Sequence, residues 1–395
     1  MPDPAAHLPT EIVSLIFVKC LVTRSLPMRH PHSMTITSEP AACEYVFPRN
    51  TQAPLTLIRV SRPWMELALS TPALWSSLGV AGYCNSHLTE SIWLSRAANF
   101  PIDFTAQVIL RGPLLNVLRP RTSRLRTLEL SFEDPGDLEP LVAVGPFESL
   151  ERLAIRGSSV VDFRIPVGVG LSLLRATPAL RICSFDNGWV DGAYSTDALV
   201  HERLTHLTMH GTLQQGYYPI LLNHVTLPSL LALHLFTLPF SQPHDLLAFF
   251  RRSKPQLKSL ALGRQLSSLT VPDIKELFSL PNSSLTHIAL VVDTTSTGLN
   301  LLQHLVEISN TLESMSLCIG GSSVIFRPFT QTLLELIPRC SKLEQLIISW
   351  HPYDHQRCSE RLATEAFLPA LQQVARPSAD IFVGVWPIFN ILESI

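Results

Sequence analysis

A spacing of apolar residues that recurs along the chain constrains the fold more than any other feature. An apolar residue is followed by two others, three and five positions later, and this triplet occurs nine times. Successive first positions are separated by between 24 residues (Leu180 to Leu204) and 31 residues (Leu312 to Leu343). Chance produces a few such triplets in a leucine-rich chain, but nine at a nearly constant interval predict a repeated structural unit. The nine first positions are Leu125, Leu150, Leu180, Leu204, Leu230, Leu257, Leu285, Leu312 and Leu343.

Each repeat is predicted to contain one strand and one helix. The second and third residues of a triplet are two positions apart, so on a strand both side chains point to the same interior face. Residues at helical spacing lie between the triplets, as at Leu299, Leu302 and Leu305. A period of roughly 20–29 residues is typical of leucine-rich repeats. We therefore expect an α/β fold, a leucine-rich-repeat solenoid over residues 121–376 with a parallel concave sheet and convex helices, because one repeat cannot bury its own apolar face.

The residues that alternate with the buried ones on each strand are predicted to line the concave face and to bind a target protein. These positions carry little charge from Ala261 to Ile347, which would suit an apolar segment of a partner. The alternative is that the chain's own C-terminal tail, residues 377–395, caps this face. Histidines here could meet a partner or sense pH, or could simply be solvated. The candidate contact residues are Arg156, His210, His234, Phe236 and Val291.

The segment before the repeats has a different pattern. Residues Ile12, Leu15 and Ile16 have the spacing of one helical face, and Pro9 with Thr10 marks the start of that helix. Residues 23–54 are predicted to form a loop insertion, after which helical sequence resumes. Pro63 lies within this second helical stretch, so we expect a kink there or a helix that begins near it. Residues 1–80 are thus predicted to form a small α-helical domain, and residues 81–120 a linker and first cap.

Within residues 8–78, apolar, proline and tryptophan positions form a pattern that resembles the F-box, in particular that of fungal F-box-like proteins with C-terminal leucine-rich repeats. The matching residues are Leu8, Pro9, Glu11, Ile12, Ile16, Phe17, Leu57, Val60, Trp64, Ala68, Thr71, Pro72, Leu74 and Trp75. About thirty residues separate the two helical parts here, whereas the family has a compact pair of helices.

The resemblance implies a function. F-box segments dock on the Skp adaptor of cullin–RING ubiquitin ligases, and the attached repeats recruit the protein that is ubiquitinated. It implies that Trp64 and Trp75 pack the small domain. The alternative is a leucine-rich-repeat scaffold without a ubiquitin-ligase role, in which residues 8–100 only cover the first repeat. The resemblance assigns the adaptor surface to Leu8, Pro9, Ile12, Ile16 and Leu57.

Several function classes are not expected. No stretch approaches 18 consecutive apolar residues, so we expect no membrane span, and with no signal peptide at Met1 we expect a cytoplasmic or nuclear protein. The net charge of −2 gives no footprint for nucleic acid. We find no nucleotide-binding, hydrolase or metalloprotease motif, and expect neither catalysis nor a cofactor. His351, His355 and Cys358 lie close together, but a polar loop is favoured over a metal site.

Overall fold

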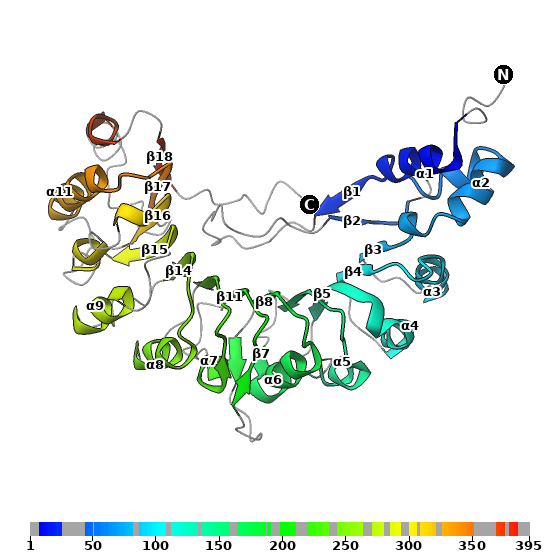
Figure 1. The fold of residues 1–395 in the computed structure, drawn as a ribbon, viewed down its shortest axis with the longest axis horizontal. Coiled ribbons are helices and arrows are strands. Elements are labelled where there is room, and N and C mark those ends of the chain that lie inside the picture. Colours follow the sequence, from blue (N-terminus) through cyan, green and yellow to red (C-terminus); the bar gives the residue numbers. More distant parts are fainter. Residues whose placement is uncertain are drawn as a thin grey trace. The chain divides into compact units, whose positions relative to one another are not determined.

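The computed structural model describes residues 8–25, 44–49, 51–81, 87–107, 112–132, 136, 138–157, 164–186, 188–190, 198–210, 220–236, 243–263, 271–279, 285–293, 300–305, 309–320, 326–350, 369–375 and 379–385. The fold is α/β. Twelve strands of the described residues form one large sheet with the order β3-β4-β5-β6-β8-β11-β13-β14-β15-β16-β17-β18 (Figure 1). The pairs whose register is defined are parallel, as the repeat predicts.

The chain divides into two compact units, Met1–Met28 with Ala41–Asp186 and Arg29–Pro40 with Asn187–Ile395. In the first unit, helices α3 to α6 lie on one side of the sheet strands (Figure 1). Its elements are α1 (Thr10–Lys19), β1 (Thr23–Ser25), β2 (Glu44–Val46), the 3₁₀ turn η2 (Leu57–Arg59), α2 (Arg62–Leu69), η3 (Pro72–Leu74), β3 (Ser77–Ala81), α3 (His87–Arg96), β4 (Ile102–Gln107), α4 (Gly112–Leu118), η4 (Arg119–Arg124), β5 (Leu125–Phe132), α5 (Leu138–Val144), β6 (Arg152–Gly157), β7 (Arg164–Pro166), α6 (Val167–Ala176) and β8 (Ile182–Asp186).

The second unit repeats the alternation of strand and helix, with α7, α8, α9 and α11 on one side of its strands (Figure 1). Residues 300–305 and 369–374 are also helical. Its elements are β9 (Gly188–Val190), β10 (Leu199–Val200), β11 (His206–His210), α7 (Ile220–His224), β12 (Val225–Thr226), β13 (Ala232–Phe236), α8 (Pro243–Ser253), β14 (Ser259–Leu262), α9 (Val271–Ser279), β15 (His287–Asp293), η8 (Ser309–Thr311), β16 (Ser314–Gly320), α11 (Phe326–Leu336), η10 (Ile337–Arg339), β17 (Gln345–Trp350) and β18 (Asp380–Val385).

The apolar triplets form the core of both units. All residues of the nine triplets are buried, including Cys183, Met209 and Met315, which are not leucines. The second residues of successive triplets are register partners across neighbouring strands: Leu233 pairs with Leu260, and Leu260 with Ile288. The prediction of in-register parallel strands with a shared buried face is therefore confirmed.

A ladder of backbone hydrogen bonds joins the repeats just before each strand. The residue after the first triplet position donates its N–H to the carbonyl of the equivalent residue one repeat earlier, at 2.7–2.9 Å. In the second unit this ladder runs from Thr205 through Leu231, Lys258, Thr286, Glu313 and Glu344 to Asp380. Because backbone atoms make these bonds, the residue types along the ladder vary and the sequence carries no sign of it.

The sheet begins earlier than the sequence indicated. Strand β3 lies at the end of the segment predicted as a helical domain, residues 1–80, and extends one residue past it, and β4 lies inside the predicted linker, residues 81–120. In β3, Leu78 is the register partner of Phe104, which in turn pairs with Leu128 of the first recognised repeat. The two strands escaped the leucine pattern because all nine recognised triplets begin with leucine, whereas the positions three residues before Leu78 and Phe104 are Trp75 and Pro101.

Two further expectations need correction. Residues 23–54 are not simply a loop, because β1 and β2 pair as antiparallel strands within them. The described part of the tail, residues 379–385, contributes β18, which pairs in parallel with β17 and extends the sheet. The tail residues Trp386, Phe389 and Ile391 lie outside the described residues.

Helix α2 begins at Arg62, one residue before Pro63, so the proline does not interrupt it. Pro63 occupies the first turn, where a missing N–H is harmless. Ser61 caps this end, since its hydroxyl accepts a hydrogen bond from the Trp64 N–H at 3.4 Å. The second alternative for this proline, a helix start, is thus the correct one. Across the described residues, no helix has the length and apolar character needed to cross a membrane.

Candidate protein-binding surfaces

Helix α1 buries only a few of its apolar residues. Val13 and Phe17 are buried against the rest of the N-terminal segment. The Phe17 ring lies 4.9 Å, centroid to centroid, from the ring of Trp64 on α2. The Ser14 hydroxyl lies 3.2 Å from the Thr71 hydroxyl, just before η3. These contacts fix which side of α1 remains outside.

The outer side of α1 is apolar. Ile12, Leu15 and Ile16 form one stripe along the helix, and Leu8 lies two residues before it. These four side chains are between 44% and 61% exposed. Pro9 at the start of the helix is exposed as well. Four large exposed apolar side chains gathered on and just before one helix face are characteristic of a surface that binds another protein. We name these four residues the α1 surface.

One predicted adaptor residue does not belong to this surface. Leu57 in η2 is only 6% exposed, so it packs inside the N-terminal segment and cannot contact a partner in this conformation. Leu15, in contrast, is the most exposed residue of the α1 surface and was not among the predicted contacts. The sequence contained the signal, because Leu15 has the same spacing as Ile12 and Ile16.

Two tryptophans join the N-terminal helices to the first strands of the sheet. Trp75 is fully buried, and its indole N–H donates to the Ala68 carbonyl at 2.9 Å. Trp93 meets it edge to face at a centroid distance of 4.9 Å, and the Arg96 guanidinium lies 4.7 Å from the centre of the Trp75 ring. Trp93 also donates to the Ser77 carbonyl at 3.2 Å. Both side chains are structural, as the resemblance implied for Trp75.

The sheet has a second face, which points away from the helices and which we call the far face. In the first unit it carries a charged pair, since the Arg156 guanidinium of β6 lies 3.4 Å from the Glu129 carboxylate of β5. Both side chains are more than four-fifths buried. Arg156, a predicted contact residue, is therefore held in place by a carboxylate on the neighbouring strand.

In the second unit the predicted contact residue His234 is buried. It is 1% exposed, and its Nε2 atom lies 2.9 Å from the Ser259 hydroxyl on β14. The prediction that this imidazole is available to a partner is therefore wrong for this conformation. His210 and Phe236 are register partners on β11 and β13, but their side chains lie outside the described residues.

The low-charge part of the far face is also buried. Ala261, Ala289 and Cys318 form a cluster on three neighbouring strands, and Val291 packs against it. Ser316 next to them is buried with no hydrogen-bond partner for its hydroxyl among the described residues. The row that the sequence predicted as an outward apolar surface is thus an internal packing layer at these positions, and of the predicted contacts only Val291 reaches its margin.

A polar row on the far face was missed. It consists of the residues directly before the second triplet positions, which share the alternation of the predicted rows. The Thr205 hydroxyl lies 2.9 Å from His206 Nδ1, and the Thr286 hydroxyl lies 2.7 Å from His287 Nδ1. On the next strands the Ser314 hydroxyl donates to Gln345 Oε1 at 3.2 Å. The row is only partly buried at His206, His287, Ser314 and Gln345.

His287 gives this row a dependence on pH. Burial lowers the pKa of His287 below its usual value of 6.5, and the nearby Glu313 and Glu344 carboxylates oppose the shift. Below pH 6.5 the unfolded chain therefore binds this proton more readily than the folded chain, and stability falls as the pH drops through the folded pKa. In urea unfolding at pH 7.5 and 5.5, His287→Gln is expected to lose less stability on acidification than the wild type. The same change at His224 on α7 is the control, and equal losses for wild type and His287→Gln would contradict the assignment.

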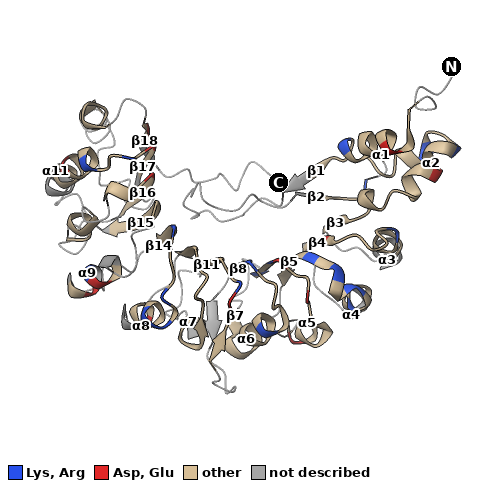
Figure 2. Cartoon of the chain, in the orientation of Figure 1, with Lys and Arg blue, Asp and Glu red and all other residues tan. Residues whose placement is uncertain are grey.

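Charged side chains of both signs are spread over the helices, and basic ones gather at η4 beside α4 (Figure 2). Burial lowers the pKa of Arg121, and burial together with the Arg121 charge lowers that of Arg124. The Arg121 guanidinium donates to the Val117 carbonyl in the last turn of α4, and the Arg124 guanidinium donates to the Phe100 carbonyl just before β4. The described residues hold no group of three or more His, Cys, Asp or Glu side chains that could bind a metal ion. His351, His355 and Cys358 lie outside the described residues.

Comparisons with known proteins add little to this geometry. No family model matches the chain, and no curated protein matches it. Among solved structures, the chain is similar to a structural-genomics crystal structure of a Bacteroides fragilis protein, with 12% sequence identity and a TM-score of 0.40. The alignment covers 67% of this chain and 66% of that one, just under two thirds of the neighbour's length. The assignment of a repeat-like α/β fold therefore rests on the strand order and register of this chain.

Proposed function

We propose that this chain is an F-box-like substrate receptor of a Skp–cullin–RING ubiquitin ligase. In this proposal the N-terminal segment docks on the Skp adaptor, and a leucine-rich-repeat solenoid binds the protein to be ubiquitinated, in the cytoplasm or the nucleus. The observation that carries the proposal is the α1 surface, which combines exposure, apolar character and a fixed orientation. The resemblance of residues 8–78 to fungal F-box-like proteins supplies the kind of partner.

The α1 surface has the properties of a binding hot spot. Its helix is anchored from behind by Phe17 on Trp64, so little conformational entropy would be lost when a partner covers Ile12 and Ile16. Large apolar side chains that become fully buried at the centre of an interface contribute most of its binding energy, about 2 kcal/mol or more each. Leu8 lies just before the helix and Ile12 in its first turn, and both would be covered by the adaptor.

On the target side, the proposal places contacts on the far face. Arg156 with Glu129 offers a preoriented charge pair in the first unit. In the second unit, the polar row at His206, His287, Ser314 and Gln345 replaces the buried His234 as the group of candidate contacts. His210 and Phe236, the last residues of β11 and β13, remain candidates, and so does Val291 within β15.

The test is adaptor binding. Leu8→Asp with Ile12→Asp is expected to weaken binding of a purified Skp adaptor on the order of 10²–10³-fold, since two anchors are lost. Ile92→Asp on α3 is the matched control, because Ile92 is 50% exposed but lies elsewhere, and it should bind as the wild type does. The proposal fails if the wild-type chain does not bind the adaptor, or if the double variant binds as tightly as the control.

The alternative is a protein-binding scaffold with no ubiquitin-ligase role. The burial of Leu57 favours it, because a segment that only caps the first strands would turn its apolar residues inward. A segment that served only as a cap would not be expected to leave the apolar side chains of the α1 surface exposed, however. The scaffold predicts no adaptor binding by any variant, with target binding unaffected by Leu8→Asp and Ile12→Asp.

A further inference from the structure

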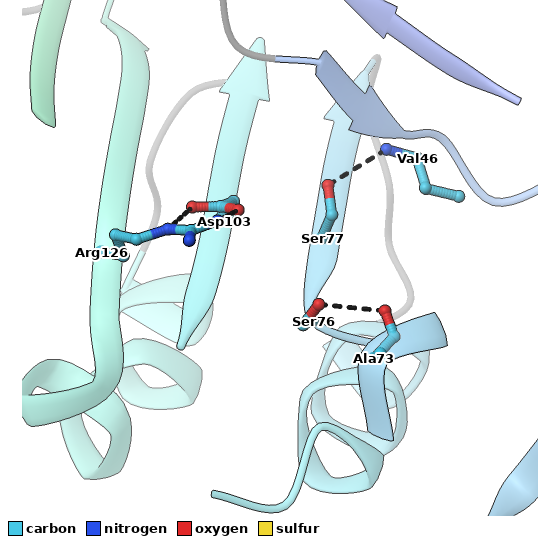
Figure 3. A network of polar contacts seen from close by, with 6 residues as sticks. All are labelled: Val46, Ala73, Ser76, Ser77, Asp103 and Arg126. Carbon is cyan, nitrogen blue, oxygen red and sulfur yellow. Dashed lines mark hydrogen bonds and ion pairs between the residues drawn. The ribbon is translucent and has the colours of Figure 1, made fainter. Parts of the chain in front are cut away.

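A short strand from the N-terminal insertion lies on the far face of the sheet. Strand β2 contacts β3 and β4, and its residues Tyr45 and Val46 are buried although the strand has only three residues. The Val46 N–H donates to the Ser77 hydroxyl of β3 at 3.4 Å (Figure 3). This part of the far face is therefore covered by the chain itself.

The residue that follows β2 fits into a gap that only glycine provides. A Cβ atom on Gly79 would lie 2.6 Å from both Cε1 and Cζ of the Phe47 ring, well inside van der Waals contact. Gly79 stands between Leu78 and Val80, whose side chains are buried on the helix side, so the Phe47 ring lies on the far face. The glycine in the middle of β3 is explained by this close approach.

The same segment is tied to α1. Strand β1 begins four residues after α1 ends at Lys19, and it pairs with β2 so that Thr23 is the partner of Val46. On its other side, α1 packs on α2 and η3, and η3 leads into the buried Trp75. Helix α1 is thus connected to the first sheet strands by two routes, one through Trp75 and the other through β2 and Phe47.

We infer that residues 44–47, which we call the strap, fix the orientation of α1 relative to strands β3–β6, with Phe47 and Gly79 as the positioning residues. The functional consequence of this fixed orientation of α1 rests on the proposed function. The α1 surface and the Arg156–Glu129 pair both belong to the first unit, so the strap sets the angle between the adaptor surface and the part of the far face that contacts the target. The covered strands β3 and β4 leave β5 as the first strand available to a target.

The test compares Gly79→Ala, Phe47→Ala and the double variant. The new methyl group displaces the Phe47 ring, so Gly79→Ala is expected to speed amide hydrogen exchange in β1 and β2. It is also expected to broaden the distribution of distances between a spin label on α1 and one at the sheet. Labels at Glu11→Cys and Arg181→Cys serve this purpose, with Cys20, Cys43, Cys84 and Cys358 replaced by serine. The other three cysteines are buried and are expected to remain unlabelled. Burial raises the pKa of the Cys183 thiol, and it raises the pKa of the Cys340 thiol to about 11, while Cys318 is only 4% exposed.

Two controls separate positioning from plain stability. Thr105→Ala lies beside Gly79 on the same face and removes a hydroxyl with no described hydrogen-bond partner, so both readouts should stay as in the wild type. Leu317→Val in the second unit lowers the stability of the fold without changing the strap, and the distribution of label distances should stay as narrow as in the wild type. In the Phe47→Ala background, Gly79→Ala should add nothing, because the ring that it displaces is gone.

The inference is overturned if Gly79→Ala leaves the distribution of label distances unchanged. It is also overturned if the effect of Gly79→Ala persists in full when the Phe47 ring is absent. Adaptor affinity should be the same for all strap variants, since the α1 surface is intact. If the wild type fails to bind the adaptor, the proposed function falls while the hydrogen-exchange and distance results still decide whether the strap positions α1.

Discussion

Replacing Trp75 by alanine is expected to lower the free energy of unfolding of the first unit by about 3–5 kcal/mol, the range for large aromatic residues in a core. The change removes a fully buried ring, its hydrogen bond to the Ala68 carbonyl and its edge-to-face contact with Trp93. The Ala68 carbonyl and the Arg96 guanidinium lose a partner at the same time. Urea unfolding followed by circular dichroism measures the loss.

Ile92→Ala is the control for this experiment, because Ile92 is the residue before Trp93 but is exposed, and a change within about 0.5 kcal/mol is expected. Equal stabilities of the Trp75 and Ile92 variants would show that the junction between the N-terminal helices and the sheet does not depend on the indole ring. The Trp75 variant is also expected to weaken adaptor binding, since α1 rests on the same helices.

The second large effect concerns the stacked core of the repeats. Leu260 lies between Leu233 and Ile288 in the register of three neighbouring strands, and all three are buried. Leu260→Ala is expected to lower the free energy of unfolding by about 2–5 kcal/mol through the cavity that it leaves. Leu260→Asp should do more, because it places an unpaired carboxylate in an apolar layer, and amide hydrogen exchange should show loss of protection in β13, β14 and β15.

Lys258→Asp provides the matched control for the charge. It introduces the same carboxylate two residues earlier at an exposed position of the backbone ladder, where the hydrogen bonds are made by main-chain atoms. A change within about 0.5 kcal/mol is expected. If Leu260→Asp were tolerated as well as Lys258→Asp, the strand register across β13–β15 would have to be incorrect.

The face assignments within the N-terminal segment show where sequence reasoning stops. Helical spacing identified Ile12, Leu15 and Ile16 as one face of α1, but spacing does not state whether an apolar face is covered or left for a partner. The answer depends on Phe17 packing against Trp64, a contact between residues forty-seven positions apart. The burial of Leu57 depends on the same packing, so its predicted role was wrong although its apolar character was read correctly.

The far face of the sheet gives a similar lesson. Alternation along a strand predicts which side chains point away from the helices, and this holds for Ala261, Ala289 and Val291. Pointing away does not mean exposure, however. Small side chains on neighbouring strands about 4.8 Å apart screen one another, and His234 turns to the Ser259 hydroxyl instead of to solvent.

The sequence by itself determined the repeat, the parallel order of its strands and the buried positions at each triplet. It could do so because burial of one strand face requires apolar side chains at a fixed spacing. That spacing occurs within a few residues of the chain in every repeat. The tertiary structure alone decided that β3, β4 and β18 extend the sheet, that β2 crosses its far face, and that Gly79 makes room for Phe47. Those features depend on hydrogen bonds between main-chain atoms and on close approach of residues distant in the chain, and neither requires a recurring residue type.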